Sequence, residues 1–268
     1  MIIELLNGTR YDVEDYGLAR LSHPIPSSEI RHNTTPVAGL GDVITDTIVD
    51  QRDISVDFAF KVTDIYDYYL LRDEINALFL RKEPFYIIFK REDYKRWLVK
   101  TADQFQIPPT PIGGSFTVKF RTVRKFAESI ASTKSDKEWD ADVWWFNGDI
   151  TWDEPLQYTF ATNKFNIINL GNTQVQPEFM DFKITIKGTT TTFLKIKNLT
   201  NGMEYQYNGT LTASDTLVID GVKSLKNGVS VFKDTTKTLL YLEPGLNEIE
   251  ITGGTVISIT FDFRFPFM

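Results

Sequence analysis

The chain has 268 residues, 42% of them hydrophobic and 24% charged, which is the composition of a folded protein with one large or two medium domains. Its net charge of −7 argues against general nucleic-acid affinity, which needs basic side chains to neutralise phosphates. The lack of cysteine excludes disulfides, thiolate zinc sites and cysteine nucleophiles, and no apolar run is long enough for a membrane-spanning helix.

The N-terminal region begins with "MIIELLNGTR", which carries an early acid and does not predict a secretory signal. Downstream, "RHNTTPVAGLGDVITDTIVDQRD" is rich in Thr, Gly and β-branched residues and has no helical stripe. We interpret Arg31 to Arg52 as an extended loop or hairpin arm. A long arm that cannot bury itself often binds a neighbouring molecule. Its candidate contact residues are Val37, Leu40, Val43, Ile44, Ile48 and Arg52.

Strands and one helix follow the arm. "DISVDFAFK" alternates apolar and polar residues, as does "SFTVKFRTV", and this period predicts half-buried strands. Between them, apolar residues at steps of three and four predict a helix that covers a sheet face and ends before Pro84. The stripe consists of Ile65, Tyr68, Leu71, Ile75 and Leu78.

A domain boundary is expected where small and charged residues interrupt the alternating pattern, from Ser129 to Lys137. We predict an N-terminal domain over 1–130, a linker over 131–142 and a C-terminal domain over 143–268. Trp144, Trp145 and Trp152 form a candidate glycan platform, because aromatic faces lie flat on sugar rings. In a strand-rich protein, clustered Trp more often fills a core or a seam between domains.

The second half alternates short apolar segments with turn residues, among them "FKITIKG", "FLKIKN", "TLVIDG", "TLLYLEPG" and "NEIEITG". This pattern predicts an antiparallel sandwich. Its structural turn motif consists of Asp220, Gly221, Asn227, Gly228, Pro244, Gly245 and Asn247. The last segment places Ile257, Ile259, Phe261, Phe263 and Phe265 on one face of a long terminal strand. We expect Asp220 and Asn247 to bond the backbone of their turns.

Catalytic signals are weak throughout. His23 and His32 lie near no nucleophile-elbow pattern, and the chain has no dinucleotide, phosphate-binding or calcium-loop motif. Asp149, Asp153 and Glu154 could serve glycoside hydrolysis, but 36 acidic residues supply such clusters by chance. We therefore predict a protein that is not an enzyme and that binds no cofactor or metal.

The order of these segments resembles the distal tail (Dit) proteins of long-tailed phages that infect Gram-positive bacteria. The matching residues are Ile219, Asp220, Asn227, Gly228, Leu242, Pro244, Gly245 and Asn247. The first half is similar too, with "RDISVDFAF", one helix before "PFYIIF", and "GGSFTVKFRTVRKFAES". The resemblance implies a mainly β fold: an N-terminal β-sandwich-like domain with one helix and an extended arm, and a C-terminal galectin-like β-sandwich.

The resemblance also implies a structural role at the tail tip of the virion, after synthesis in the host cytoplasm. The N-terminal domains would form a hexameric ring that joins the tail tube to the baseplate hub. The implied partners are other copies of the chain, the major tail protein, a tail-associated hub protein and the tape measure protein, with no specific nucleic acid and no membrane insertion. The alternative from the residues themselves is a carbohydrate-binding module that recognises cell-wall glycans through its Trp cluster.

Overall fold

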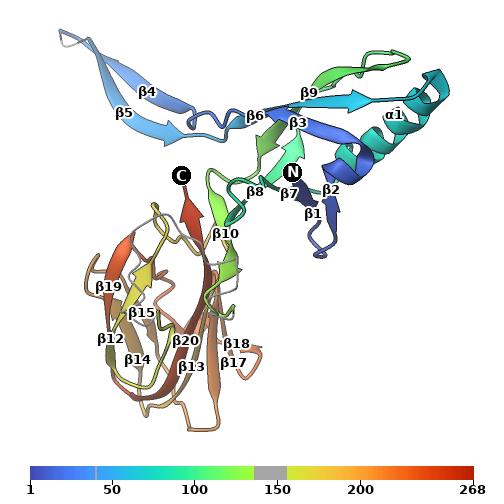
Figure 1. Ribbon diagram of the computed structural model, residues 1–268. Coiled ribbons are helices and arrows are strands. Elements are labelled where there is room, and N and C mark those ends of the chain that lie inside the picture. The colour runs from blue at the N-terminus through green and yellow to red at the C-terminus, as the bar shows by residue number, and fades with distance from the viewer. Residues whose placement is uncertain (40, 136–155) are drawn as a thin grey trace. The chain divides into compact units, whose positions relative to one another are not determined.

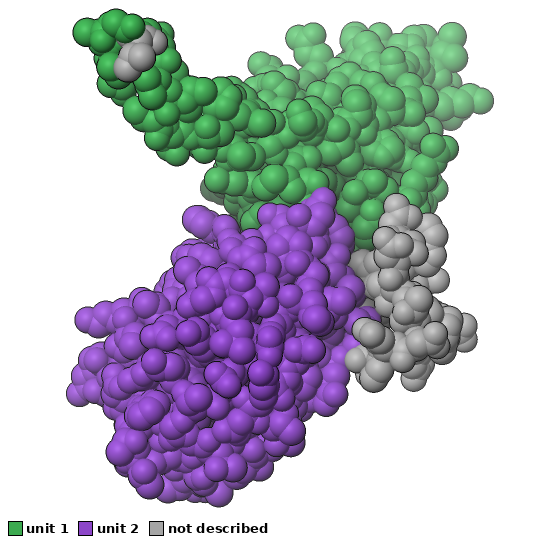
Figure 2. Space-filling model, turned by 90° about the vertical axis from the view of Figure 1, so that its left-hand side faces the viewer, with its two compact units in different colours: residues 1–127, 268 green, residues 128–267 purple. Residues whose placement is uncertain are grey.

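The computed structural model describes residues 1–39, 41–135 and 156–268, and the chain divides into two compact units (Figures 1 and 2). The N-terminal unit is Met1–Ala127 with Met268, and the C-terminal unit is Glu128–Phe267. Each unit consists mainly of antiparallel strands, so the predicted mainly β fold class is confirmed. The predicted boundaries and linker stay a prediction, because part of the expected linker lies outside the described residues.

The N-terminal unit is built on an antiparallel sheet with the strand order β2-β1-β7-β8-β9-β6-β3. A short 3-10 helix, η1 (Val13–Tyr16), joins β2 to β3. The strands are β1 (Ile2–Glu4), β2 (Arg10–Asp12), β3 (Leu18–Ser22), β6 (Asp53–Lys61), β7 (Phe85–Ile88), β8 (Lys95–Thr101) and β9 (Gly113–Thr122).

The core of this unit lies on one face of β6 and β9. Residues 54, 56, 58 and 60 of β6 are buried while their neighbours are at least partly accessible, as the alternation predicts. Phe58 packs against Phe79 of the helix and Phe116 of β9, with ring centroids 5.3 and 5.5 Å apart. Aromatic rings therefore join the helix to the sheet.

The predicted helix is α1 (Ile65–Phe79). Asp64 caps its first turn, since its carboxylate accepts hydrogen bonds from the backbone N–H groups of Tyr66 and Asp67 at 2.8 and 2.9 Å. Tyr68, Ile75 and Leu78 of the expected stripe are buried, whereas Ile65 and Leu71 are half-buried. The helix covers the apolar face of the sheet with the side that its period predicts.

The C-terminal unit contains two antiparallel sheets. The first has the order β18-β17-β16-β13-β20, and both β10 and β11 pair with β20; the second has the order β12-β19-β14-β15. The strands of the first sheet are β10 (Ala127–Ser132), β11 (Thr159–Phe160), β13 (Phe182–Thr189), β16 (Thr216–Asp220), β17 (Lys223–Lys226), β18 (Val229–Ser230) and β20 (Thr255–Phe267). Those of the second sheet are β12 (Lys164–Asn169), β14 (Leu194–Asn198), β15 (Glu204–Tyr207) and β19 (Gly245–Thr252). A short 3-10 helix, η3 (Phe232–Asp234), follows β18.

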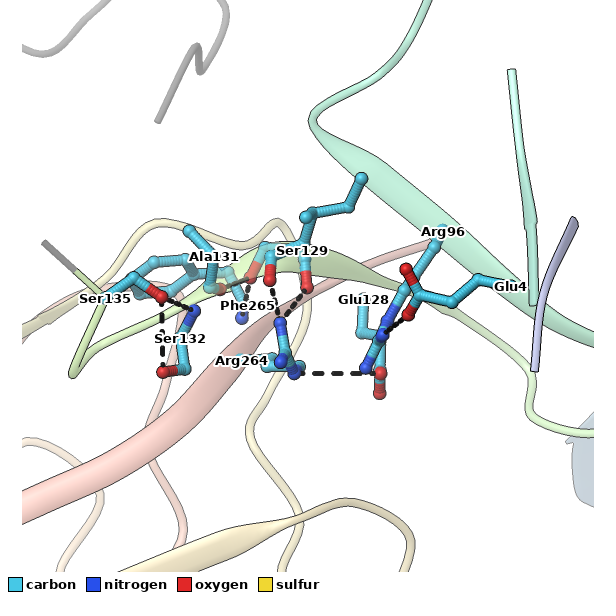
Figure 3. A network of polar contacts seen from close by, with 10 residues as sticks. Glu4, Arg96, Glu128, Ser129, Ala131, Ser132, Ser135, Arg264 and Phe265 are labelled. Atoms are coloured by element: carbon cyan, nitrogen blue, oxygen red, sulfur yellow. Dashed lines mark hydrogen bonds and ion pairs between the residues drawn. The ribbon is translucent and has the colours of Figure 1, made fainter. Parts of the chain in front are cut away.

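Side chains of β10 reinforce its contact with the end of β20 (Figure 3). The Ser129 hydroxyl accepts a hydrogen bond from the Phe265 backbone N–H at 2.9 Å and donates to the Ala131 carbonyl at 2.5 Å. The Arg264 guanidinium donates to the Ser129 carbonyl at 3.0 Å. In the N-terminal unit, Figure 3 also shows the ion pair between Glu4 and Arg96. Both clusters satisfy polar groups that are largely withdrawn from water.

One residue of the terminal strand lies on the opposite face from the one predicted. Ile259, Phe261, Phe263 and Phe265 are buried, but Ile257 is 48% exposed. The register between β13 and β20 shifts at this point, so that Lys187 pairs with Ser258 and Gly188 with Val256. Ile257 is the extra residue of this bulge, and a bulge turns the following side chains to the other face.

The predicted strand at "TLLYLEPG" is also wrong. From Thr238 to Pro244 the segment has one isolated bridge, between Leu242 and Val175, and the strand β19 begins only at Gly245. Side chains replace the ladder here: the Asn198 and Asn201 amides both donate to the Tyr241 carbonyl, at 2.9 and 3.1 Å. These bonds satisfy the backbone without a neighbouring strand.

Candidate assembly surface

The segment predicted as a loop or hairpin arm is a hairpin of β4 (Ile30–Val37) and β5 (Gly41–Val49), which we call the arm (Figure 1). At its tip Gly39 and Gly41 have φ angles of +82° and +80°, which glycine adopts without strain. Thr45 is the extra residue of a bulge, and its hydroxyl donates to the Asn33 carbonyl at 3.0 Å. The β-branched residues of the arm thus form a paired ribbon.

Both faces of the arm carry apolar side chains. The register puts Ile30 and Ile44 on one face and Val37, Val43 and Ile48 on the other. Ile30 and Ile44 are 58% and 57% exposed, and the arm stands clear of the rest of its unit in Figure 2. A two-stranded hairpin is marginally stable by itself in water. A surface of this kind gains stability when a partner covers it.

Arg52 holds the base of the arm. Its side chain is 7% exposed and donates hydrogen bonds to the Pro26 carbonyl at 3.2 Å and the Ser28 hydroxyl at 2.8 Å. Its guanidinium carbon lies 4.8 Å from the ring centroid of Trp97, and burial lowers the pKa of Arg52. Because Arg52 follows β5 while Pro26 and Ser28 precede β4, one side chain connects both ends of the arm to the sheet.

The predicted contact residues therefore occupy different environments. Val37, Val43 and Ile44 are exposed, and Ile48 is half-buried. Arg52 is buried, so the structure assigns it to the base of the arm rather than to the accessible contact surface. The remaining candidate, Leu40, lies outside the described residues. The sequence signal that could have separated Arg52 from the others is its position directly before the alternating strand β6.

Two turns of the C-terminal motif have the expected hairpin geometry. Asn227 and Gly228 both have positive φ, 51° and 82°, and join β17 to β18 as a two-residue loop. Gly221, with φ of +57°, occupies the first loop position between β16 and β17.

The Asp220 carboxylate, expected to bond the backbone, instead pairs with Lys183 at 3.3 Å. Asn227 also donates to Asp215 at 2.6 Å, and hydrogen bonds, chiefly from Thr212, hold the pKa of Asp215 well below its usual range.

The Pro244-Gly245 turn is held by Asn247, which is 0% exposed. Its side-chain oxygen accepts hydrogen bonds from the Glu243 backbone N–H at 2.8 Å and the Asn198 amide at 2.9 Å. Its side-chain nitrogen donates to the carbonyls of Glu243 and Gly245, at 2.8 and 3.1 Å. All four groups are within the protein, so Asn247 has a structural role and is not free to bind a ligand. Asn198, its buried partner, was not predicted.

The glycan candidates Trp144, Trp145 and Trp152 lie outside the described residues, as do the carboxylates Asp149, Asp153 and Glu154. Within residues 1–39, 41–135 and 156–268, no group of three side chains could hold a metal ion. No helix in those ranges has the length and apolarity needed to cross a membrane.

Comparisons with known proteins show what the N-terminal half and the overall fold are similar to. Residues 7–122 match the family model described as the phage tail protein RIFT-related domain. The crystal structure of the Dit protein of phage SPP1, described as a paradigm of the hub adsorption apparatus in phages infecting Gram-positive bacteria, is similar along 98% of both chains, with a TM-score of 0.70 and 14% identity. The resemblance to distal tail proteins is thereby confirmed, and at this identity the structural match establishes the fold alone.

Two structures of the phage p2 baseplate in its activated conformation, with Sr and with Ca, are weaker matches. Their TM-scores are 0.47 and 0.49 at 12% identity, over 98% of this chain and 96% and 97% of theirs. No curated protein sequence matches the chain.

Proposed function

We propose that this chain, whose residues 7–122 match the phage tail protein RIFT-related domain and whose fold is similar to that of a distal tail protein, is a structural protein of the tail tip. It assembles as a hexameric ring that joins the tube of major tail protein to a tail-associated hub protein of the adsorption apparatus. The tape measure protein is a further proposed partner. The protein has no catalytic role in this assembly.

The observation that carries this proposal is the exposed arm. Its two strands present apolar side chains on both faces, and its base is fixed by the buried Arg52. A fixed, extended and two-faced apolar ribbon suits permanent assembly, because burial of apolar surface stabilises contacts between copies. The match of the surrounding unit to a phage tail domain supports a tail as the place of assembly.

The test is the solution mass across a concentration series, measured by light scattering. A ring of fixed size predicts a species at six times the 30.8 kDa chain mass that persists over a broad concentration range. Replacement of residues 30–49 by a short Gly-Ser linker should abolish this species while both units stay folded. The linker is feasible because Glu29 and Asp50 are already joined by a backbone hydrogen bond of 2.7 Å.

A matched pair of substitutions controls for general surface effects. Ile44→Asp places a charge on the arm and should weaken assembly, whereas Val229→Asp changes an exposed β-branched residue of the C-terminal unit and should not. Normal assembly without the arm would contradict its proposed role. A chain that stays monomeric at every concentration would favour the glycan-binding alternative, and a panel of cell-wall polysaccharides would then be the next test.

A further inference from the structure

A groove in the N-terminal unit lies between the β1–β2 turn and the connection from α1 to β7. It has a volume of about 370 Å³ and is lined by Leu5, Leu6, Asn7, Arg81, Lys82, Glu83 and Pro84. Leu6 is exposed, and Leu5 and Pro84 also line the groove, so the groove presents apolar carbons to solvent. It could therefore accept an apolar segment of another molecule.

The groove also carries one available positive charge. The Arg81 guanidinium is already engaged, because it donates to the Leu78 carbonyl at 3.0 Å and lies 5.4 Å from the Tyr11 ring centroid. Lys82 is exposed, and within the described part of the chain its ammonium has no ion-pair partner. An acidic group that approached the groove would meet Lys82 at its rim.

The outer half of the arm has complementary chemistry. From Pro36 to Asp46 it contains two carboxylates, Asp42 and Asp46, and no basic residue. Val43 and Ile44 follow Asp42 directly and are exposed. Asp42 itself is exposed and has no ion-pair partner among the residues that the structure describes. The outer half thus combines apolar side chains with an available negative charge.

We propose that the outer half of the arm of one copy docks in this groove of the next copy, with Asp42 facing Lys82. The inference rests on the proposed function, because it names the surface that receives the arm in the ring. Apolar contact of the arm with Leu5, Leu6 and Pro84 supplies the adhesion, and the charge pair fixes the register of the contact.

Another exposed apolar surface of the same unit fits the arm less well. The outward face of α1 presents Tyr66, Tyr69 and Leu70, which are all exposed. Asp67, Asp73 and Glu74 belong to the same helix, as does Arg72, whose guanidinium carbon lies 5.3 Å from the Tyr69 ring centroid. The acidic outer half of the arm would meet like charges there, and like-charge contact across an interface is unfavourable. Asp67, Arg72, Asp73 and Glu74 of the helix have a net charge of −2, whereas Arg81, Lys82 and Glu83 of the groove have a net charge of +1, so charge favours the groove.

The contact must join two copies, because the arm and the β1–β2 turn lie on opposite sides of the N-terminal unit in Figure 1. A chain's own arm points away from its own groove. The contact is therefore head-to-tail: one surface of each copy binds a different surface of the next. Interfaces of this kind produce a closed ring when the rotations from copy to copy add up to a full turn. The proposed function requires such a ring.

A charge-reversal cycle tests the contact in the full chain. Asp42→Lys and Lys82→Asp should each raise the concentration for half-assembly, by roughly 10-fold, because each places like charges across every interface of the ring. The double variant restores the opposite charges and should return towards the wild type. Lys187→Asp, an exposed lysine of β13 in the C-terminal unit, is the matched control.

Disulfide trapping gives a second readout, which is clean because the chain contains no cysteine. A mixture of Asp42→Cys and Lys82→Cys chains should form covalent dimers under mild oxidation, and a mixture of Asp42→Cys and Lys187→Cys chains should not. If the wild type forms rings, both charge-reversal variants assemble equally well and the Asp42→Cys and Lys82→Cys mixture gives no trapped dimer, the docking site is overturned and the ring stands. If the wild type never assembles and the same mixture gives no trapped dimer, both proposals are overturned.

Discussion

Removal of the Asn247 side chain should destabilise the C-terminal unit, because this buried group joins the Pro244-Gly245 turn to β14. Asn247→Ala eliminates four hydrogen bonds of 2.8 to 3.1 Å, two accepted and two donated. A typical protein hydrogen bond contributes about 1 kcal/mol net, and each buried group left without a partner costs more. Asn198 keeps its second bond, to the Tyr241 carbonyl, which limits the loss. We expect a destabilisation of about 3 kcal/mol.

Hydrogen exchange of the full chain can locate this change. A loss of about 3 kcal/mol multiplies the opening equilibrium roughly 150-fold, so amides of β14 and β19 should exchange faster by that factor. Amides of β6 and β9 in the N-terminal unit should be unaffected. Asn208→Ala is the control, because Asn208 is exposed and should change stability by less than about 0.5 kcal/mol. If Asn247→Ala and Asn208→Ala exchange alike, the four bonds do not stabilise the turn.

Three further predictions concern the bulge, the arm base and acid. Gly188→Ala should destabilise the C-terminal unit by about 2 kcal/mol in urea unfolding, since its Cβ would lie 2.6 Å from the Thr255 carbonyl oxygen. Arg52→Ala should make the arm sensitive to limited proteolysis while the sheet stays protected; equal cleavage of the wild type would refute this. Hydrogen bonds and charge from Arg121, then Lys119, lower the pKa of Asp53, so its contribution is complete above the unfolded pKa, near 4, and is lost as pH falls. The acid-induced drop in the urea midpoint should therefore be smaller in Asp53→Asn.

The elements that the sequence predicted are those whose signal is local. The period of β6 and the stripe of α1 each place apolar residues against one surface, and the fold buries most of them. The turns at Gly221 and Asn227 could also be predicted from the sequence, because Gly and Asn are the residues that adopt positive φ most readily. In these cases the information lies within a few residues, so composition and spacing suffice.

The errors arise from contacts between residues far apart in the chain. The face of Ile257 depends on the bulge opposite Gly188, which no pattern within β20 indicates. The segment near Tyr241 has strand-like residues, but amides of Asn198 and Asn201 satisfy its backbone. Arg52 was a candidate contact residue of the arm, and its burial depends on Trp97 in β8. Long-range pairing decided all three environments.

The two apolar faces of the arm bear on the choice of partners in the proposed assembly. A groove on the next copy can cover one face of the arm, for example that of Ile30 and Ile44. The other face, with Val37 and Val43, would then stay in contact with water, where its exposed apolar area favours further association. A closed ring gives each arm one receiving groove, so a second, different partner is needed to cover the remaining face. The tube protein or the hub protein of the proposed function would supply that surface, and the order of assembly would follow: the ring forms first, and its uncovered arm faces then bind the next component.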